Sequence, residues 1–167
     1  MTTPASDSRA ALLAVARAVP DPELPVLTLG DLGVIRDLRV AGDGAVEVDL
    51  TPTYTGCPAT EVIADDVRDA LRRVSGYQIR VRVRTVLAPA WTTDWMSEEG
   101  RQKLRAYGIA PPQASNSRRA LFGEQAVACP RCGSNQTELL SEFGSTSCKA
   151  LWRCKTCREP FDYFKCH

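Results

Sequence analysis

The sequence predicts an α+β fold: a small mixed sheet with helices packed on one face, in the order αββαβα, followed by a small β-rich module. Three observations lead to this prediction. Hydrophobic residues make up 44% of the 167 residues and charged residues 25%, a balance typical of a packed core. Segments with helical and strand periodicity alternate over the first two thirds of the chain. Six of the seven cysteines lie between Cys129 and Cys166.

The beginning of the chain reads as a helix followed by a hairpin. Residues 8–19 carry apolar side chains at helical spacing. Residues 34–40 and 45–50 alternate between apolar and polar side chains, and the turn residues at 41–44 lie between them. Strict alternation along the first strand places Ile35 on the outward, polar face.

A second helix and a third strand follow. Residues 58–74 form a strongly periodic helix, with acidic residues early and basic residues late, which suits the helix dipole. Residues 78–86 alternate as a strand whose polar positions form an arginine row. We expect this row to be the wet face of the sheet, paired with Glu47 and Asp49. An anion site is the alternative. The row consists of Arg80, Arg82 and Arg84.

A lone cysteine precedes the second helix, in Thr55-Gly56-Cys57-Pro58. Pro58 suits the first position of a helix, so Cys57 is expected at the N-cap. Free N–H groups and the helix dipole would there lower the pKa of the thiol and favour thiolate. The alternative is a plain turn with an inert, half-buried cysteine. Two carboxylates, Asp21 and Glu23, lie in a proline-flanked turn that is either functional or simply solvated.

The segment after the third strand is apolar and contains Trp91 and Trp95. These tryptophans cover an edge of the sheet or, in the sharper alternative, contact a partner. Ser97 is expected to cap a short helix that ends at Gly108. The prolines and polar residues that follow are typical of a linker. We therefore expect a first domain at 1–110, a linker at 111–126 and a second domain at 127–167.

The C-terminal segment contains two C-x-x-C knuckles separated by 21 residues. Each knuckle places two thiolates on one side of a tight loop, and two knuckles complete a tetrahedron. In a reducing compartment such a cluster indicates metal binding rather than disulfides. The pattern predicts a structural zinc ribbon, with iron as the alternative ion, whose ligands are Cys129, Cys132, Cys154 and Cys157. Two spare cysteines, Cys148 and Cys166, are candidate additional ligands.

Composition argues against several classes of function. A formal net charge of +1 weighs against general nucleic-acid binding. The N-terminus lacks a signal-peptide core and no apolar run reaches membrane-spanning length, so we expect a cytoplasmic protein. The only histidine is His167, and no Walker loop, dinucleotide fingerprint or Ser-His-Asp set is present. We therefore expect a protein that is not an enzyme.

Several motifs together resemble known families. The SufT-like iron–sulfur assembly domain is similar to the part of the chain that contains Asp21-Pro22-Glu23, Asp31-Leu32-Gly33-Val34-Ile35, Thr55-Gly56-Cys57-Pro58 and residues 89–97. With the ribbon, and especially residues 143–151 and 159–166, the chain from residue 10 to 167 resembles the PaaD (or PaaJ) family. Members of this family are accessory subunits encoded with phenylacetyl-CoA epoxidase.

The resemblance implies a role in aerobic phenylacetate catabolism. The epoxidase is a multicomponent oxygenase with a di-iron site in its oxygenase subunits and a flavin and a 2Fe–2S cluster in its reductase. The resemblance implies help in assembling or maintaining a metal centre, above all the reductase cluster. It also implies that Cys57 is the functional thiol, with Asp21 and Glu23 nearby. The implied partners are the epoxidase subunits and the iron–sulfur assembly machinery, without nucleic acid or membrane.

The leading hypothesis is therefore a maturation factor in which Cys57 transiently binds iron or an Fe–S cluster. A structural adaptor that bridges oxygenase and reductase without metal transfer is the alternative. A thiol-redox enzyme would need a resolving cysteine whose Cα lies within about 7 Å of that of Cys57. A nucleic-acid-binding ribbon is the least favoured hypothesis. The sequence leaves open a homodimer that shares ligands between chains.

Overall fold

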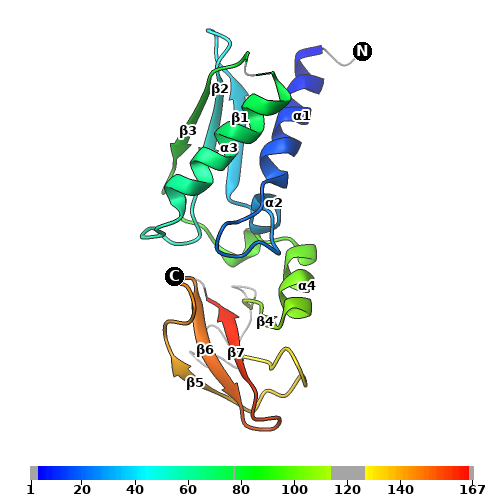
Figure 1. The fold of residues 1–167 in the computed structure, drawn as a ribbon, viewed down its shortest axis with the longest axis vertical. Helices are drawn as coiled ribbons and strands as arrows, with labels where there is room; N and C mark the ends of the chain where they lie inside the picture. Colours follow the sequence, from blue (N-terminus) through cyan, green and yellow to red (C-terminus); the bar gives the residue numbers. More distant parts are fainter. Residues whose placement is uncertain (1–3, 77, 114–126, 166–167) are drawn as a thin grey trace. The chain divides into compact units, whose positions relative to one another are not determined.

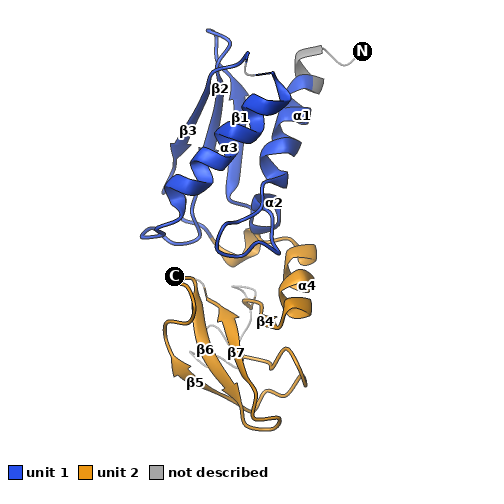
Figure 2. Ribbon diagram, in the orientation of Figure 1, with its two compact units in different colours: residues 1–91 blue, residues 92–167 orange. Residues whose placement is uncertain are grey.

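The computed structural model describes residues 4–76, 78–113 and 127–165. Its contacts divide the chain into two compact units, residues 1–91 and 92–167 (Figure 2). The first unit contains helices on a three-stranded sheet, and the second contains a four-stranded sheet. The predicted α+β class with a β-rich C-terminal module is confirmed. No helix in the described ranges is long and apolar enough to cross a membrane.

The first unit contains the predicted helix, two strands, helix and strand in that order, with an additional short helix, α2, before the first strand (Figure 1). The last helix of the predicted order, α4 (Glu98–Tyr107), falls in the second unit. The sheet has the strand order β1-β2-β3. Strands β1 and β2 are antiparallel, whereas β3 is parallel to β2 because a helix crosses over between them. Helices α1 and α3 lie side by side over one face of the sheet. The elements are α1 (Pro4–Ala18), α2 (Leu29–Leu32), β1 (Ile35–Val40), β2 (Val46–Leu50), α3 (Thr60–Val74) and β3 (Val81–Thr85).

The core of this unit lies between α3 and the sheet. Ile63, Val67 and Leu71 recur at helical spacing on α3 and are buried. Along β2 the side chains alternate, so one face enters the core and the other carries Glu47 and Asp49. The buried residues of β2 are Val46, Val48 and Leu50.

A bulge in β1 changes the face on which Ile35 lies. Ile35 pairs with Leu50 and Asp37 pairs with Asp49, so Arg36 is an extra residue on β1. The bulge directs Ile35 into the core, where it is only 3% exposed. The prediction that Ile35 shares the outward face of Asp37 is therefore wrong, because it assumed an uninterrupted period of two.

Charged side chains pair across the outer face of the sheet, as predicted. Arg82 lies opposite Glu47 and Arg84 lies opposite Asp49. Arg84 donates from Nε and Nη2 to the two oxygens of Asp49, at 3.0 and 2.9 Å. Arg39 donates to the same carboxylate from Nη1 at 2.9 Å. The bonds from Arg84 and Arg39 lower the pKa of Asp49. These arginines pair with carboxylates across the strands, which supports the sheet interpretation over the anion site.

Asp49→Asn should lower the free energy of unfolding at pH 7 by about 1 kcal/mol, because it removes a carboxylate shared by two arginines. The folded-state pKa of Asp49 lies below the unfolded value of about 3.9. Its contribution is therefore present above that pH and is lost as the pH falls through the folded value. In urea unfolding, the gap between wild type and variant should narrow from pH 7 toward pH 3.

The control for this measurement is Asp65→Asn, at an exposed ion pair with Arg68 on α3. It should change the free energy of unfolding by less than about 0.5 kcal/mol. Two results would contradict the role assigned to the Asp49 carboxylate. One is an equal loss of unfolding free energy in the two variants, and the other is a difference between wild type and Asp49→Asn that does not narrow in acid.

The second unit contains a sheet with the strand order β4-β7-β6-β5 (Figure 1). Strands β5, β6 and β7 form an antiparallel meander, and β4 adds to β7 in parallel. The elements are the 3₁₀ turn η1 (Thr93–Trp95), α4 (Glu98–Tyr107), β4 (Ile109–Ala110), β5 (Thr137–Ser141), β6 (Lys149–Cys154) and β7 (Pro160–Phe164).

Helix α4 begins and ends where its caps predict. The hydroxyl of Ser97 accepts a bond of 2.9 Å from the N–H of Gly100, and Gly108 ends the helix at φ 86°. The chain then enters β4, whose residues Ile109 and Ala110 pair with β7. Helix α4 is thus grouped with the ribbon. The predicted domain boundaries, after residue 110 and before residue 127, concern which parts of the chain fold independently, and they stay a prediction.

The core of the second unit is small and includes cysteines. Trp152 packs edge-to-face on Tyr163, with ring centroids 6.1 Å apart and an interplanar angle of 74°. The buried cluster consists of Ala110, Val127, Cys129, Ala150, Trp152, Cys154, Phe161 and Tyr163. Such a core is too small to be stable without a further constraint, which a bound metal would supply.

Candidate functional site

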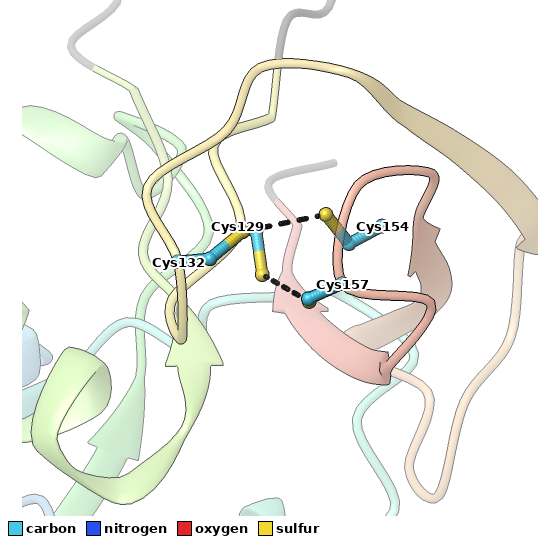
Figure 3. Close-up of side chains that lie close together, drawn as sticks. All are labelled: Cys129, Cys132, Cys154 and Cys157. Atoms are coloured by element: carbon cyan, nitrogen blue, oxygen red, sulfur yellow. Dashed lines mark hydrogen bonds between the residues drawn. The ribbon is translucent and has the colours of Figure 1, made fainter.

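Four cysteine sulfurs converge from the two knuckles (Figure 3). The Sγ atoms all lie within 4.8 Å of one another. Cys129 and Cys157 are 3.8 Å apart, and Cys132 and Cys154 are 3.5 Å apart. A disulfide needs about 2 Å. A tetrahedral zinc ion with bonds of about 2.3 Å separates its sulfurs by about 3.8 Å. The four thiols therefore fit one zinc ion.

The backbone of each knuckle holds its thiols in place. The N–H of Cys129 donates to the carbonyl of Ser134 at 2.9 Å, and the N–H of Cys154 donates to the carbonyl of Glu159 at 3.0 Å. The hydroxyls of Ser134 and Thr156 join the two loops at 2.8 Å. These bonds fix the positions of the sulfurs, so the site is preorganised for an ion.

The thiols differ in their readiness to ionise. The N–H groups of Cys157 and Thr156 lower the pKa of Cys154 to about 6, although burial opposes the shift. The N–H of Glu159 lowers the pKa of Cys157, but burial and the neighbouring thiols together raise it to about 12. These thiols belong to Cys154, Cys132 and Cys129. A bound cation would favour ionisation of all four thiols.

Cys57 lies in the loop between β2 and α3. The helix begins at Thr60, with Ala59 as its N-cap and no capping side chain. The N–H of Thr60 bonds to the carbonyl of Cys57 at 3.3 Å, which closes a turn over Pro58. The prediction that Cys57 is the N-cap is therefore wrong: the turn delays the helix by two residues.

The environment of Cys57 favours the neutral thiol. Burial raises its pKa most, and the carboxylates of Glu23 and Asp21 raise it further. The N–H of Ala59 and the side chain of Thr60 lower it, but they do not offset the burial. The predicted activation to thiolate is therefore wrong for the isolated chain. Cys57 is half-buried rather than enclosed.

The structure brings Asp21 and Glu23 within electrostatic range of Cys57. Asp21 is buried, and its Oδ1 accepts bonds from the N–H groups of Glu23 and Leu24 at 2.9 and 2.8 Å. The loop is closed by the bridge between Pro20 and Thr28. Asp21 thus shapes the loop that presents Glu23. Of the described residues, only the four ribbon cysteines form a group able to hold a metal ion.

The other candidates have different surroundings. Cys148 is buried, and its Sγ lies 3.1 Å from the hydroxyl of Thr146, apart from the four-cysteine group. Cys166 and His167 lie outside the described residues. Trp91 is 5% exposed and donates from Nε1 to the carbonyl of Leu32 at 2.8 Å. It anchors a loop of the first unit, which favours the structural alternative.

Thr60 is a site residue that sequence reasoning missed. Its Oγ1 donates to the carbonyl of Cys57 at 2.9 Å, and its side chain also lowers the pKa of that thiol. A threonine three positions after a cysteine is the only signal in the sequence, and it is indistinguishable from a helix-start residue.

Comparisons with known families match both halves of the chain. Residues 9–83 match the family model described as "Iron-sulfur cluster assembly protein". Residues 113–165 match the model described as "PaaD zinc beta ribbon domain". An Escherichia coli protein named as a component of 1,2-phenylacetyl-CoA epoxidase is 53% identical over 148 residues, which cover 89% of this chain and 87% of that protein. The chain belongs to the PaaD family.

Other relatives match a little over half of this PaaD family member. An "Fe-S protein maturation auxiliary factor" of Porphyromonas gingivalis is 41% identical over 88 residues, which cover 53% of this chain and 82% of the relative. The crystal structure of a "Domain of Unknown Function DUF59" from Bacillus anthracis aligns with a TM-score of 0.53 at 28% identity. It covers 57% of this chain and 90% of that one.

Removal of one ribbon ligand should release zinc. Cys154→Ser removes a fully buried thiol, so zinc content should fall from about one per chain to a small fraction of that, and the ribbon should unfold. Elemental analysis and Trp152 fluorescence measure the two effects. Cys148→Ser is the matched control and should keep its zinc. Full zinc content in Cys154→Ser would contradict the assigned site.

The side chain of Thr60 should affect the pKa of the Cys57 thiol. Thr60→Val removes a hydroxyl that favours thiolate, so the pKa of Cys57 should rise, whereas Thr60→Ser should preserve it. Glu23→Gln removes a nearby negative charge and should lower the pKa. The pH dependence of iodoacetamide labelling at Cys57, read by peptide mass spectrometry, measures these shifts. Identical profiles for Thr60→Val and Thr60→Ser would contradict the role of the hydroxyl.

Proposed function

We propose that this protein is an accessory maturation factor of the phenylacetyl-CoA epoxidase system. It would help to assemble or maintain an Fe–S centre, with the 2Fe–2S cluster of the reductase as its client. The observation that carries this proposal is the union, in one chain, of an Fe–S assembly domain and the PaaD ribbon. The proposal assigns the chain to the cytoplasm and gives it no catalytic turnover of its own.

Cys57 is proposed as a transient ligand for iron or an Fe–S cluster. Burial and two carboxylates raise the pKa of the thiol, so it rests protonated and resists oxidation. An approaching iron cation favours the thiolate, and we assign Glu23 or Asp21, which interact electrostatically with the thiol, as the acceptor of its proton. Cys57 is the only cysteine of residues 1–91. Any further thiolate ligands then come from outside this unit, which makes binding labile and suits transfer to a client.

The ribbon is proposed to be structural. Four cysteines fill the coordination sphere of zinc, and such a closed site leaves no position for a substrate or an exchanging ligand. The zinc then stabilises the second unit, while the Cys57 loop handles the transferred metal. This division keeps the two sets of thiols chemically separate.

The adaptor alternative, without metal transfer, is supported by the neutral state of the Cys57 thiol. Its candidate contact residues were the two tryptophans, of which Trp91 is buried and hydrogen-bonded and Trp95 is half-buried. An adaptor would still co-purify with oxygenase and reductase in fixed proportion. A Cys57 substitution separates the two functions, because only the maturation factor requires the thiol.

Cys57→Ser should leave the fold and the zinc content unchanged but lower the 2Fe–2S occupancy of the co-expressed reductase several-fold. Iron and acid-labile sulfide in the purified reductase, with circular dichroism of the variant, measure both effects. Glu61→Gln, an exposed change near the start of α3, is the matched control and should keep the occupancy. A fully loaded reductase with Cys57→Ser would favour the adaptor.

A further inference from the structure

A groove of about 440 Å³ lies beside the second knuckle of the ribbon. Charged side chains from β5, β6 and the knuckle loop form most of its wall. The lining residues are Glu138, Arg153, Cys154, Lys155 and Arg158. The groove therefore places three cations and one carboxylate next to a metal-binding thiol that is fully buried.

The single carboxylate of the groove is shared by two of its cations. Arg153 donates to Glu138 from Nε at 2.9 Å and also from Nη2, and Nζ of Lys155 lies 3.6 Å from the other oxygen of Glu138. Arg158 makes no ion pair with any described residue. Three cations outnumber one carboxylate among the side chains that line the groove, and a zinc ion on four thiolates would add a formal charge of −2 beside Cys154. Among the described residues, Arg158 is the lining cation that makes no ion pair with a carboxylate.

The backbone at Arg158 is strained, and the other knuckle provides a direct comparison. The residue after the second cysteine adopts a left-handed conformation in both knuckles, with φ 73° at Gly133 and φ 63° at Arg158. Glycine adopts this conformation freely, whereas a residue with a side chain does so at a cost. The second knuckle therefore carries an arginine where glycine would fold more easily, and strain of this kind marks functional positions.

We infer that this groove binds an acidic segment of a partner protein, with Arg158 as the cation that meets its carboxylate. The guanidinium can bind both carboxylate oxygens, which adds orientation to the charge attraction. Arg153 and Lys155 remain on Glu138 and add positive potential around the contact. The inference concerns the ribbon and holds whether or not Cys57 binds iron.

A protein fits this surface better than a nucleic acid does. Three cations are fewer than the roughly six to ten phosphate contacts of a strongly salt-dependent nucleic-acid site. Strand β5, which carries Glu138, also carries Leu139 and Leu140, whose side chains are 46% and 47% exposed. A basic groove beside exposed leucines matches an interface that contains both carboxylates and apolar side chains.

The test is an NMR titration of the full-length zinc protein at low salt with end-blocked hexaglutamate. Heptathymidylate, which carries the same charge, is titrated in parallel. Arg158→Gln removes the charge and keeps the strained backbone, whereas Arg158→Gly removes both. Arg131→Gln is the matched control, because it removes an exposed arginine of the first knuckle that does not line the groove.

Hexaglutamate should shift the amide signals of residues 153–158 in a saturable way and bind more tightly than heptathymidylate. Both Arg158 variants should weaken this binding at least threefold, and Arg131→Gln by less than 1.5-fold. Arg158→Gly alone should also melt at a higher temperature than Arg158→Gln. The inference is overturned by equal effects at Arg131 and Arg158, by no saturable shift, or by tighter binding of heptathymidylate.

Discussion

The second unit depends on four thiols that converge on one point, within 4.8 Å of one another. Cys129 and Cys154 are part of its small buried cluster, and the sulfurs already lie at distances that suit one zinc ion. A bound ion ties the loop before β5 to the loop between β6 and β7, which the short strands alone would hold weakly. Everything that the ribbon presents, including the Arg158 groove, requires this constraint.

The one cysteine of the first unit, Cys57, is not part of a metal-binding group among the described residues. The sheet of this unit is stabilised by a core on one face and a lattice of arginines and carboxylates on the other, and neither involves Cys57. The thiol is half-buried beside two carboxylates and has no second cysteine in its unit. One set of thiols is therefore closed around an ion, and the other is left incomplete. An incomplete ligand is the kind that a transfer step needs.

Periodicity and spacing predicted most of the fold and the zinc ligands, because both depend on regular patterns. Irregularities escaped prediction. The bulge at Arg36 coincides with a break in the alternation, where Ile35 and Arg36 lie on the wrong faces, but the break alone does not say that a residue is inserted. The turn at Cys57 delays the helix although Pro58 suits a helix start. The raised pKa of Cys57 depends on burial and on Glu23, which lies 34 positions earlier in the chain. The backbone at Arg158 is left-handed, a conformation that favours glycine, so an arginine at this position gives no sign of it in the sequence.

The most direct test of this separation of thiols is metal and sulfide analysis of the isolated protein, purified and reconstituted without oxygen. One zinc per chain and no sulfide-to-iron charge-transfer bands are the predicted result, because Cys57 lacks the ligands to retain a cluster alone. A stable cluster on the isolated chain, lost in Cys57→Ser, would contradict the proposal that this thiol binds iron only in passing.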